Sequence, residues 1–143
     1  MNMLSALAAA VSLSVIAAHT ASAGVCSQNA CSTRLMGVVS SGASPGSQPV
    51  AGARVVIYRA GTDSAVPLAE TVTNARGQFS AKVPKQAAHE IRYAIASSGH
   101  TELMTVMAAT DRPHLRINEM TTVASAYAMA QFFKGKAIAG KSL

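Results

Sequence analysis

Residues 49–84 read PVAGARVVIYRAGTDSAVPLAETVTNARGQFSAKVP and contain three strand-like runs with the turns that join them. Residues 53–60 are rich in β-branched side chains and alternate in polarity, which is typical of a half-buried strand. Residues 68–73 predict a second, weaker strand. Asn74 and Gly77 are preferred residues for the first and last positions of a type I turn. Residues 78–83 again alternate between apolar and polar side chains. The pattern predicts a β-hairpin centred on this turn.

Further strands are expected on both sides of this stretch. Residues 35–39 form a candidate first strand, and residues 40–49 are rich in Ser, Gly and Pro, so we expect them to form a loop. Strands are also expected at 91–97, 101–107 and 115–117. Both faces of the run 101–107 are largely apolar, which predicts a strand that is covered on both sides or carries an interface.

The hydrophobic period changes at Asn118, which is a good N-cap residue. Glu119 supplies a negative charge to the first turn, and Gly135 is a typical C-terminal stop. We therefore expect a helix over residues 119–134, of about four turns. The tail 135–143 is basic and contains glycine, which predicts a linker.

The predicted helix is apolar nearly all round. Met120 and Tyr127 share one face, whereas Phe132 and Phe133 lie on other sides. A helix of this kind needs burial on more than one side, and a small sandwich offers only one. We therefore expect these four residues to contact a partner. A membrane-surface helix or a junction with a following domain are the alternatives.

The N-terminal segment 1–23 has the features of a secretory signal peptide. An apolar run over 4–18 precedes the small-residue pattern Ala21-x-Ala23, after which cleavage is expected. No Lys or Arg precedes the run, so a buried helix or an uncleaved anchor is the alternative. Cleavage would leave 24–143, the size of one domain, with no membrane span expected.

The segment 24–33 contains Cys26 and Cys31, the two cysteines of the chain. Two thiols in an exported chain most often pair, so we expect a disulfide that closes a short N-terminal loop. A zinc site is the alternative, but two thiols without a nearby His pair are too few ligands.

The formal charge of +6 arises from basic residues spread along the chain. There is no Lys/Arg run and there are few interleaved aromatic residues, so we expect no nucleic-acid partner. A solvated basic surface is the simplest interpretation. Attachment to anionic polymers of the cell envelope is the other, since such a balance favours acidic surfaces.

The sequence contains no recognisable catalytic arrangement. His89, His100 and His114 lie on separate segments without metal-ligand spacing, and the six acidic residues lie apart. Nucleophile elbows, phosphate loops and zinc-protease motifs are missing from the sequence. We therefore predict no catalytic residue, no metal and no cofactor.

The runs VAGARVVIY at 50–58 and PLAETVTNARGQF at 67–79, followed by Val83 and Pro84, resemble the carboxypeptidase regulatory-like domains, which are transthyretin-like. Four residues match that family's hairpin pattern, with Asn in place of its Asp: Thr73, Asn74, Gly77 and Phe79. The resemblance implies a mainly β fold, a seven-stranded Greek-key sandwich over 34–118 followed by a C-terminal α-helix. It also implies an accessory module without peptidase activity.

These observations together predict a non-catalytic binding or structural module that is secreted or periplasmic in a bacterium. Its partner would be an unknown protein or a cell-envelope polymer. The segment 118–132, NEMTTVASAYAMAQF, looks like one that follows such domains in larger exported proteins, so the chain is also expected to be the N-terminal part of one. A carbohydrate-binding module of the cell envelope is the alternative, which the chain's few aromatic residues, none of them Trp, disfavour. A small hydrolase is a third hypothesis.

Overall fold

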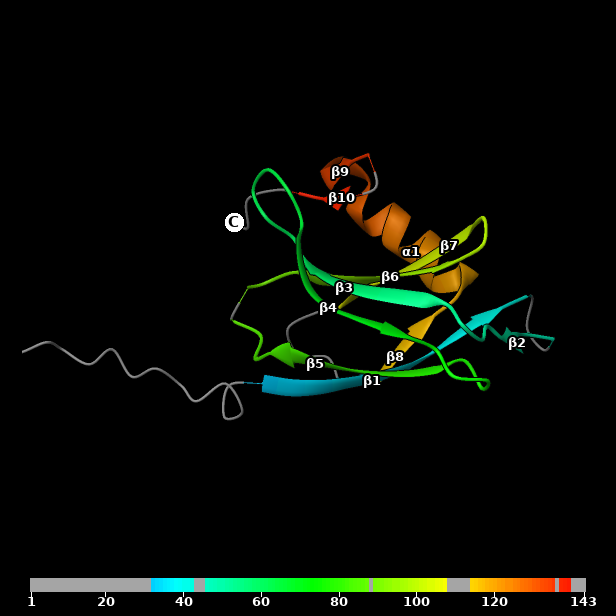
Figure 1. The fold of residues 1–143 in the computed structure, drawn as a ribbon. Helices are drawn as coiled ribbons and strands as arrows, with labels where there is room; N and C mark the ends of the chain where they lie inside the picture. The colour runs from blue at the N-terminus through cyan, green and yellow to red at the C-terminus, as the bar shows by residue number, and fades with distance from the viewer. Residues whose placement is uncertain (1–31, 43–45, 88, 108–113, 136, 140–143) are drawn as a thin grey trace, which may run out of the picture.

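The chain folds into two facing β-sheets, and its C-terminal segment covers the outer side of one of them (Figure 1). The structure is a computed structural model. The residues it describes are 32–42, 46–87, 89–107, 114–135 and 137–139. The predicted signal peptide and the predicted disulfide between Cys26 and Cys31 lie outside the described residues, so both stay predictions.

The first sheet, here called the β1 sheet, is built around β1 (Ser32–Ser41). Strand β5 (Gln78–Pro84) pairs with β1 antiparallel over seven residues. Strand β8 (His114–Ile117) pairs with β1 in parallel. The short strand β2 (Gln48–Pro49) pairs with the end of β1. The prediction of a loop over 40–49 is therefore wrong at the two ends of this segment, which pair as strands. The pairing uses backbone N–H and C=O groups, which every residue except proline has, so Ser and Gln do not prevent it.

The second sheet, here called the β3 sheet, has the strand order β4-β3-β6-β7 and is antiparallel throughout. Its strands are β3 (Arg54–Arg59), β4 (Val66–Val72), β6 (Arg92–Ser98) and β7 (Thr101–Met107). All seven strands expected from the sequence are present in the two sheets, and β2 is the eighth. The mainly β fold with a C-terminal helix is thus confirmed.

The predicted β-hairpin at Asn74–Gly77 is wrong in one respect. The turn itself forms: the Gly77 N–H donates to the Asn74 carbonyl at 2.9 Å, and Gly77 has a φ of 70°. However, β4 belongs to the β3 sheet and β5 to the β1 sheet. The turn therefore carries the chain from one sheet to the other, with β4 paired to β3 and β5 paired to β1.

The main core lies between the two sheets and consists of alternate, inward-facing side chains. Gly37 in β1 lies opposite Phe79 in β5, and a Cβ on Gly37 would be 2.5 Å from Phe79 Cζ. The ring therefore fills the place of the missing side chain. The buried residues of this core are Val39, Val55, Ile57, Phe79, Ala81, Val83, Ala94, Ala96, Leu103, Met107, Leu115 and Ile117.

The C-terminal segment differs from the expected helix and linker. Helix α1 (Glu119–Met129) is followed by the 3-10 turn η1 (Ala130–Phe132) and by the strands β9 (Phe133–Lys134) and β10 (Ala137–Ile138), which pair with each other. The helix ends at Met129, before the expected residue 134, and Gly135, with a φ of 63°, lies in the turn between β9 and β10.

A second apolar cluster lies on the outer side of the β3 sheet. Tyr93, Met104 and Ile138 are its buried residues, and Phe132 and Phe133 pack against it. Residues 137–139, expected to belong to a linker, thus pack against the sheet. Strand β7 is apolar on both faces because one face meets the main core and the other meets this cluster, which confirms the expectation for 101–107.

Candidate functional site

Strand β7 is an edge strand of the β3 sheet, and helix α1 lies along its open edge (Figure 1). The Met104 N–H donates to Thr122 Oγ1 at 2.9 Å, and the Val106 N–H donates to Ser125 Oγ at 3.1 Å. The Thr121 hydroxyl donates to the Met104 carbonyl at 2.9 Å. The hydroxyl face of the helix therefore takes the place of a further strand, which protects the edge from pairing with other chains.

The start of α1 is fixed by a capping box. Asn118 Oδ1 accepts from the Thr121 N–H at 2.9 Å, and Thr121 Oγ1 accepts from the Asn118 N–H at 3.0 Å. Glu119 Oε1 accepts from the Gly42 N–H at 2.9 Å, which ties the helix to the end of β1. This backbone hydrogen bond lowers the pKa of Glu119.

The outward side of α1 is apolar and strongly exposed. Met120, Val123 and Tyr127 lie one turn apart along the helix, and 78%, 67% and 90% of their surfaces are exposed. No charged residue occurs between Glu119 and Lys134. Large exposed apolar side chains gathered on one surface are typical of an interaction site. We call these three residues the outer face of α1.

The four residues expected to contact a partner fall into two groups. Met120 and Tyr127 belong to the outer face of α1. Phe132 and Phe133 follow the helix, are half-buried and pack against the second apolar cluster. The structure therefore places the two phenylalanines in an intramolecular contact, and the partner role of all four remains a prediction.

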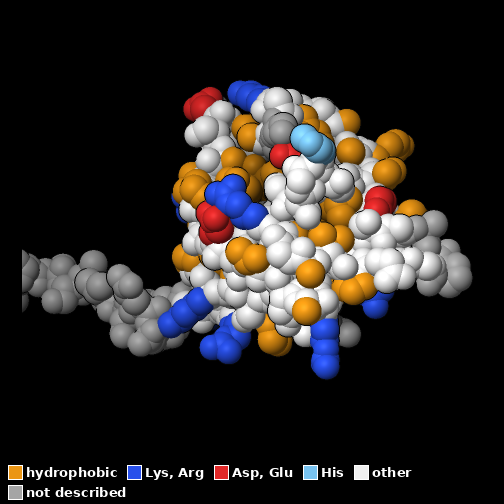
Figure 2. Space-filling model, turned by 45° about the vertical axis from the view of Figure 1, so that its right-hand side comes forward, with side chains coloured by type: hydrophobic (Ala, Val, Ile, Leu, Met, Phe, Trp, Pro, Cys, Tyr) orange, Lys and Arg blue, Asp and Glu red, His pale blue; other side chains and the backbone are white. Residues whose placement is uncertain are grey.

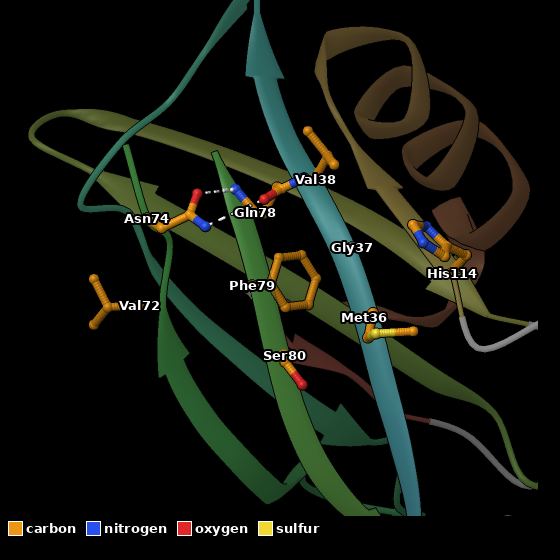
Figure 3. A pocket seen from close by; sticks show the side chains of 9 residues that line it. All are labelled: Met36, Gly37, Val38, Val72, Asn74, Gln78, Phe79, Ser80 and His114. Atoms are coloured by element: carbon orange, nitrogen blue, oxygen red, sulfur yellow. Dashed lines mark hydrogen bonds between the residues drawn. The ribbon is translucent and has the colours of Figure 1, made fainter. Parts of the chain in front are cut away.

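A shallow hollow of about 350 Å³ lies on the outer side of the β1 sheet (Figure 3). Besides Gly37, Val72, Asn74 and Phe79, it is lined by Met36 and Val38 of β1, by Gln78 and Ser80 of β5 and by His114 of β8. These side chains alternate with the core residues, so the strand register places them on one outward face. The hollow combines a small apolar floor with amide, hydroxyl and imidazole groups.

The charged groups nearest the cores form ion pairs within the fold. Arg92 is 3% exposed, and its Nε donates to Glu90 Oε1 at 2.6 Å while its Nη1 donates to the Pro84 carbonyl at 2.7 Å. Burial alone would raise the pKa of Glu90, but the hydrogen bonds from Arg92 and from the Ala87 N–H outweigh it and lower that pKa. This pair anchors the end of β5 to β6.

A second ion pair joins Arg54 to Glu70 on exposed surface across β3 and β4. Arg54 Nε and Nη2 donate to the two carboxylate oxygens of Glu70 at 2.6 and 2.8 Å. Because this bidentate hydrogen bond favours the charged forms, it raises the pKa of Arg54 and lowers that of Glu70.

Two of the three tyrosines pack inside the fold, and the third is exposed. Tyr58 stacks on Tyr93 with ring centroids 5.2 Å apart, and both belong to the second apolar cluster. Burial raises the pKa of Tyr93, although the hydrogen bond that its hydroxyl accepts from the Ile138 N–H acts against this. Tyr58 is therefore not an open platform for a sugar ring, and Tyr127 is the exposed tyrosine.

The three histidines within the described residues remain apart. His114 lies in β8, His100 in the turn between β6 and β7, and His89 in the loop before β6, where it has a φ of 62°. Among the described residues, no three His, Cys, Asp or Glu side chains could hold a metal ion together. None of the described helices is long and apolar enough to cross a membrane.

Sequence reasoning missed the inward, hydroxyl-bearing face of α1. Its signal was present as the spacing Thr121, Thr122 and Ser125, which places three hydroxyls on one side of a helix. It also missed the hollow, because β8 lies next to β1 through a parallel pairing between segments about 80 residues apart in sequence.

Comparison with known proteins adds little beyond the fold. No protein-family model matches the chain, and no curated protein matches it either. Among solved structures, a double mutant of the shaft pilin SpaA from Lactobacillus rhamnosus GG is similar, with a TM-score of 0.43 and 14% identity. The similarity covers 61% of this chain and 49% of the pilin, so this chain matches about half of that protein's length. No functional argument rests on it.

Proposed function

We propose that the protein is a non-catalytic exported module with a binding or structural role, and that it makes contact through the outer face of α1. The observation that supports this proposal is that the two sides of the helix have different surroundings. Its hydroxyl side is used to close the edge of β7, whereas Met120, Val123 and Tyr127 are directed to solvent. Tyr and Met are enriched in interfaces, and charged residues are depleted at their centres.

The partner to which we commit is a second copy of this chain. The protein carries a formal charge of +6, so most parts of its surface would repel the same part of another copy. The outer face of α1 carries no charge, so two copies can meet there without like-charge repulsion. Ala124 and Ala128, both exposed, allow close approach between the larger side chains. A two-fold helix-to-helix contact satisfies these conditions.

Sedimentation equilibrium on residues 24–143 over a range of concentrations tests this proposal. We expect reversible dimers, and we expect Tyr127→Lys to weaken dimerisation about tenfold or more because it places a charge at the centre of the contact. Ala75→Lys, at an exposed position in the turn before β5, is the matched control and should leave dimerisation unchanged. A monomer at all concentrations, or equal loss in both variants, would overturn the proposal.

The family resemblance and the location extend this proposal. Export to the periplasm or outside the cell rests on the signal-like segment 1–23, and the transthyretin-like assignment rests on the residues around Asn74 and Gly77. N-terminal sequencing of the protein released from a bacterial host tests export: a new N-terminus at Gly24 is expected, and an intact Met1 in the cytoplasm would contradict it.

A further inference from the structure

The outer side of the β1 sheet carries several basic side chains and no acidic side chain from its strands β1, β5 and β8. Arg34, Lys82 and Arg116 all project from this side, because they alternate with core residues in β1, β5 and β8. Arg76 lies just before β5 and Lys85 just after it, and both are exposed. The three strands contain no Asp or Glu. In Figure 2 the lower part of the molecule shows Lys and Arg side chains without acidic ones among them.

The described carboxylates lie elsewhere. Glu70 and Glu90 are paired with arginines of the β3 sheet, and Glu119 is bound to the Gly42 N–H. Asp63 lies between β3 and β4, and Glu102 lies in β7, so both belong to the β3 sheet or its loops. The segment 108–113 lies outside the described residues, and its one acidic and one basic residue cancel. Among the described residues, the excess of positive over negative charge therefore lies on the outer side of the β1 sheet.

The register creates a like-charge contact on this side. Arg34 and Lys82 are directly opposite each other in the pairing of β1 with β5. Side chains in such positions have Cβ atoms about 5 Å apart, and like charges there are destabilising. Arg116 is opposite Val38. Val38 follows Arg34 by four residues along β1, which is about 13 Å at the usual rise per residue of a strand.

The hollow extends along β1 from Met36 to Val38, so it lies beyond Arg34 and beside Arg116. It offers the Gln78 amide, the Ser80 hydroxyl and the His114 imidazole as hydrogen-bonding groups, and Met36 and Val38 as an apolar floor. Hydroxyl and amide groups beside apolar side chains suit a sugar unit. Tyr, Phe and Trp are not exposed among the described residues of these three strands, which disfavours stacking of nucleic-acid bases and of sugar rings alike, so a ligand here would be held by ionic contacts and hydrogen bonds.

We propose that the outer side of β8, β1 and β5 is a binding site for a linear acidic polysaccharide. Acidic groups along the polymer contact Arg34 and Arg116, and a sugar unit between them occupies the hollow. This site is separate from the outer face of α1, so it does not depend on the dimer proposed above. The interaction weakens with added salt, because its charges are exposed to solvent.

Binding of the mature protein to polygalacturonate, measured by calorimetry at low and at physiological salt, tests this proposal. We expect binding to polygalacturonate and none to uncharged dextran. The double variant Arg34→Gln with Arg116→Gln should weaken binding about tenfold, since two ionic contacts are lost. The matched control Arg59→Gln with Lys134→Gln removes the same net charge from the β3 sheet side, and it should change the affinity less than about twofold.

Three results would overturn the proposal. The first is the absence of polygalacturonate binding at low salt. The second is an equal loss in both double variants, which would mean that net charge alone attracts the polymer. The third is tighter binding of single-stranded oligo(dT) or of phosphatidylglycerol vesicles at the same salt concentration. Because none of the four substitutions touches α1, failure here leaves the dimer intact, and a monomeric protein that binds polygalacturonate separates the two proposals.

Discussion

Gly37 shows how one residue determines the packing of the β1 sheet. Its absent side chain leaves the space that the ring of Phe79 occupies, and a Cβ there would also lie 2.7 Å from the Leu115 carbonyl oxygen. Gly37→Ala should therefore destabilise the fold by about 1–3 kcal/mol through overpacking. Urea denaturation followed by circular dichroism measures this change. An unchanged midpoint would show that the two strands can separate without cost.

The control for this prediction is Gly52→Ala. Nothing lies within 4 Å of a Cβ at that position, but its φ of 67° favours glycine. We therefore expect a loss of about 1 kcal/mol from backbone strain alone. A loss at Gly37 no greater than that at Gly52 would mean that the contact with Phe79 is not a packing constraint.

The ion pair between Glu90 and Arg92 predicts the acid sensitivity of the fold. The folded pKa of Glu90 is lowered, so its contribution is present above its unfolded pKa of about 4.3 and is lost as the pH falls through the folded pKa. Glu90→Gln should lose about 1–3 kcal/mol near neutral pH, because the buried Arg92 loses its charged acceptor. The measurement is the free energy of unfolding between pH 7 and pH 3.

The variant should also have a flatter pH dependence than the wild type, because the proton uptake by Glu90 is removed. Glu70→Gln is the control, since its partner Arg54 is exposed and its pair contributes little. If Glu90→Gln and the wild type lost stability in parallel below pH 5, the acid sensitivity would come from other carboxylates.

At the scale of elements, strands were easier to predict than their pairing. Alternating polarity around Val55, Ile57 and Phe79 reflects burial on one face, which a local pattern records directly. The pattern does not record which strand lies beside which. The Asn74–Gly77 turn was therefore predicted correctly as a turn and wrongly as a hairpin, because the sheet in which each strand pairs is decided by contacts far away in sequence.

The helix was predicted from its cap and period, but its orientation and its end were not. Because the helix is apolar nearly all round, its pattern did not indicate which side would lie against the sheet. Here the open edge of β7 presents backbone N–H groups that need acceptors, and the hydroxyls of Thr122 and Ser125 supply them. The early end of the helix at Met129 depends on the packing of Phe132 and Phe133 against the second cluster.

Removing these acceptors gives a direct prediction. Thr122→Val with Ser125→Ala leaves the Met104 and Val106 N–H groups without their partners, which should cost about 2–4 kcal/mol in total. Hydrogen exchange of these two amides should accelerate to the rate of an open strand edge. Ala126→Ser, an exposed position on the same helix, is the control. Unchanged exchange at Met104 and Val106 would mean that the hydroxyls do not hold the helix to β7.

At the scale of the whole molecule, two surfaces among the described residues are candidates for contacts with other molecules. The outer face of α1 is uncharged and apolar, and the outer side of the β1 sheet is basic and polar. They lie on opposite layers of the fold (Figure 1). The sequence indicated the first through its over-apolar helix, but it could not indicate the second, since the basic residues appear scattered until the strand register brings them to one side.

Helix α1 is held to β7 by its hydroxyl side, and we propose that it binds a second copy of the chain with its outer face. Thr122 and Val123 are adjacent in sequence but belong to these two different sides. The decisive measurement is sedimentation equilibrium on Thr122→Val and Val123→Lys, both prepared as residues 24–143. The account predicts that Thr122→Val, although less stable, still dimerises like the wild type, whereas Val123→Lys is monomeric. Equal dimerisation of the two proteins, or loss of the dimer in Thr122→Val alone, would contradict it.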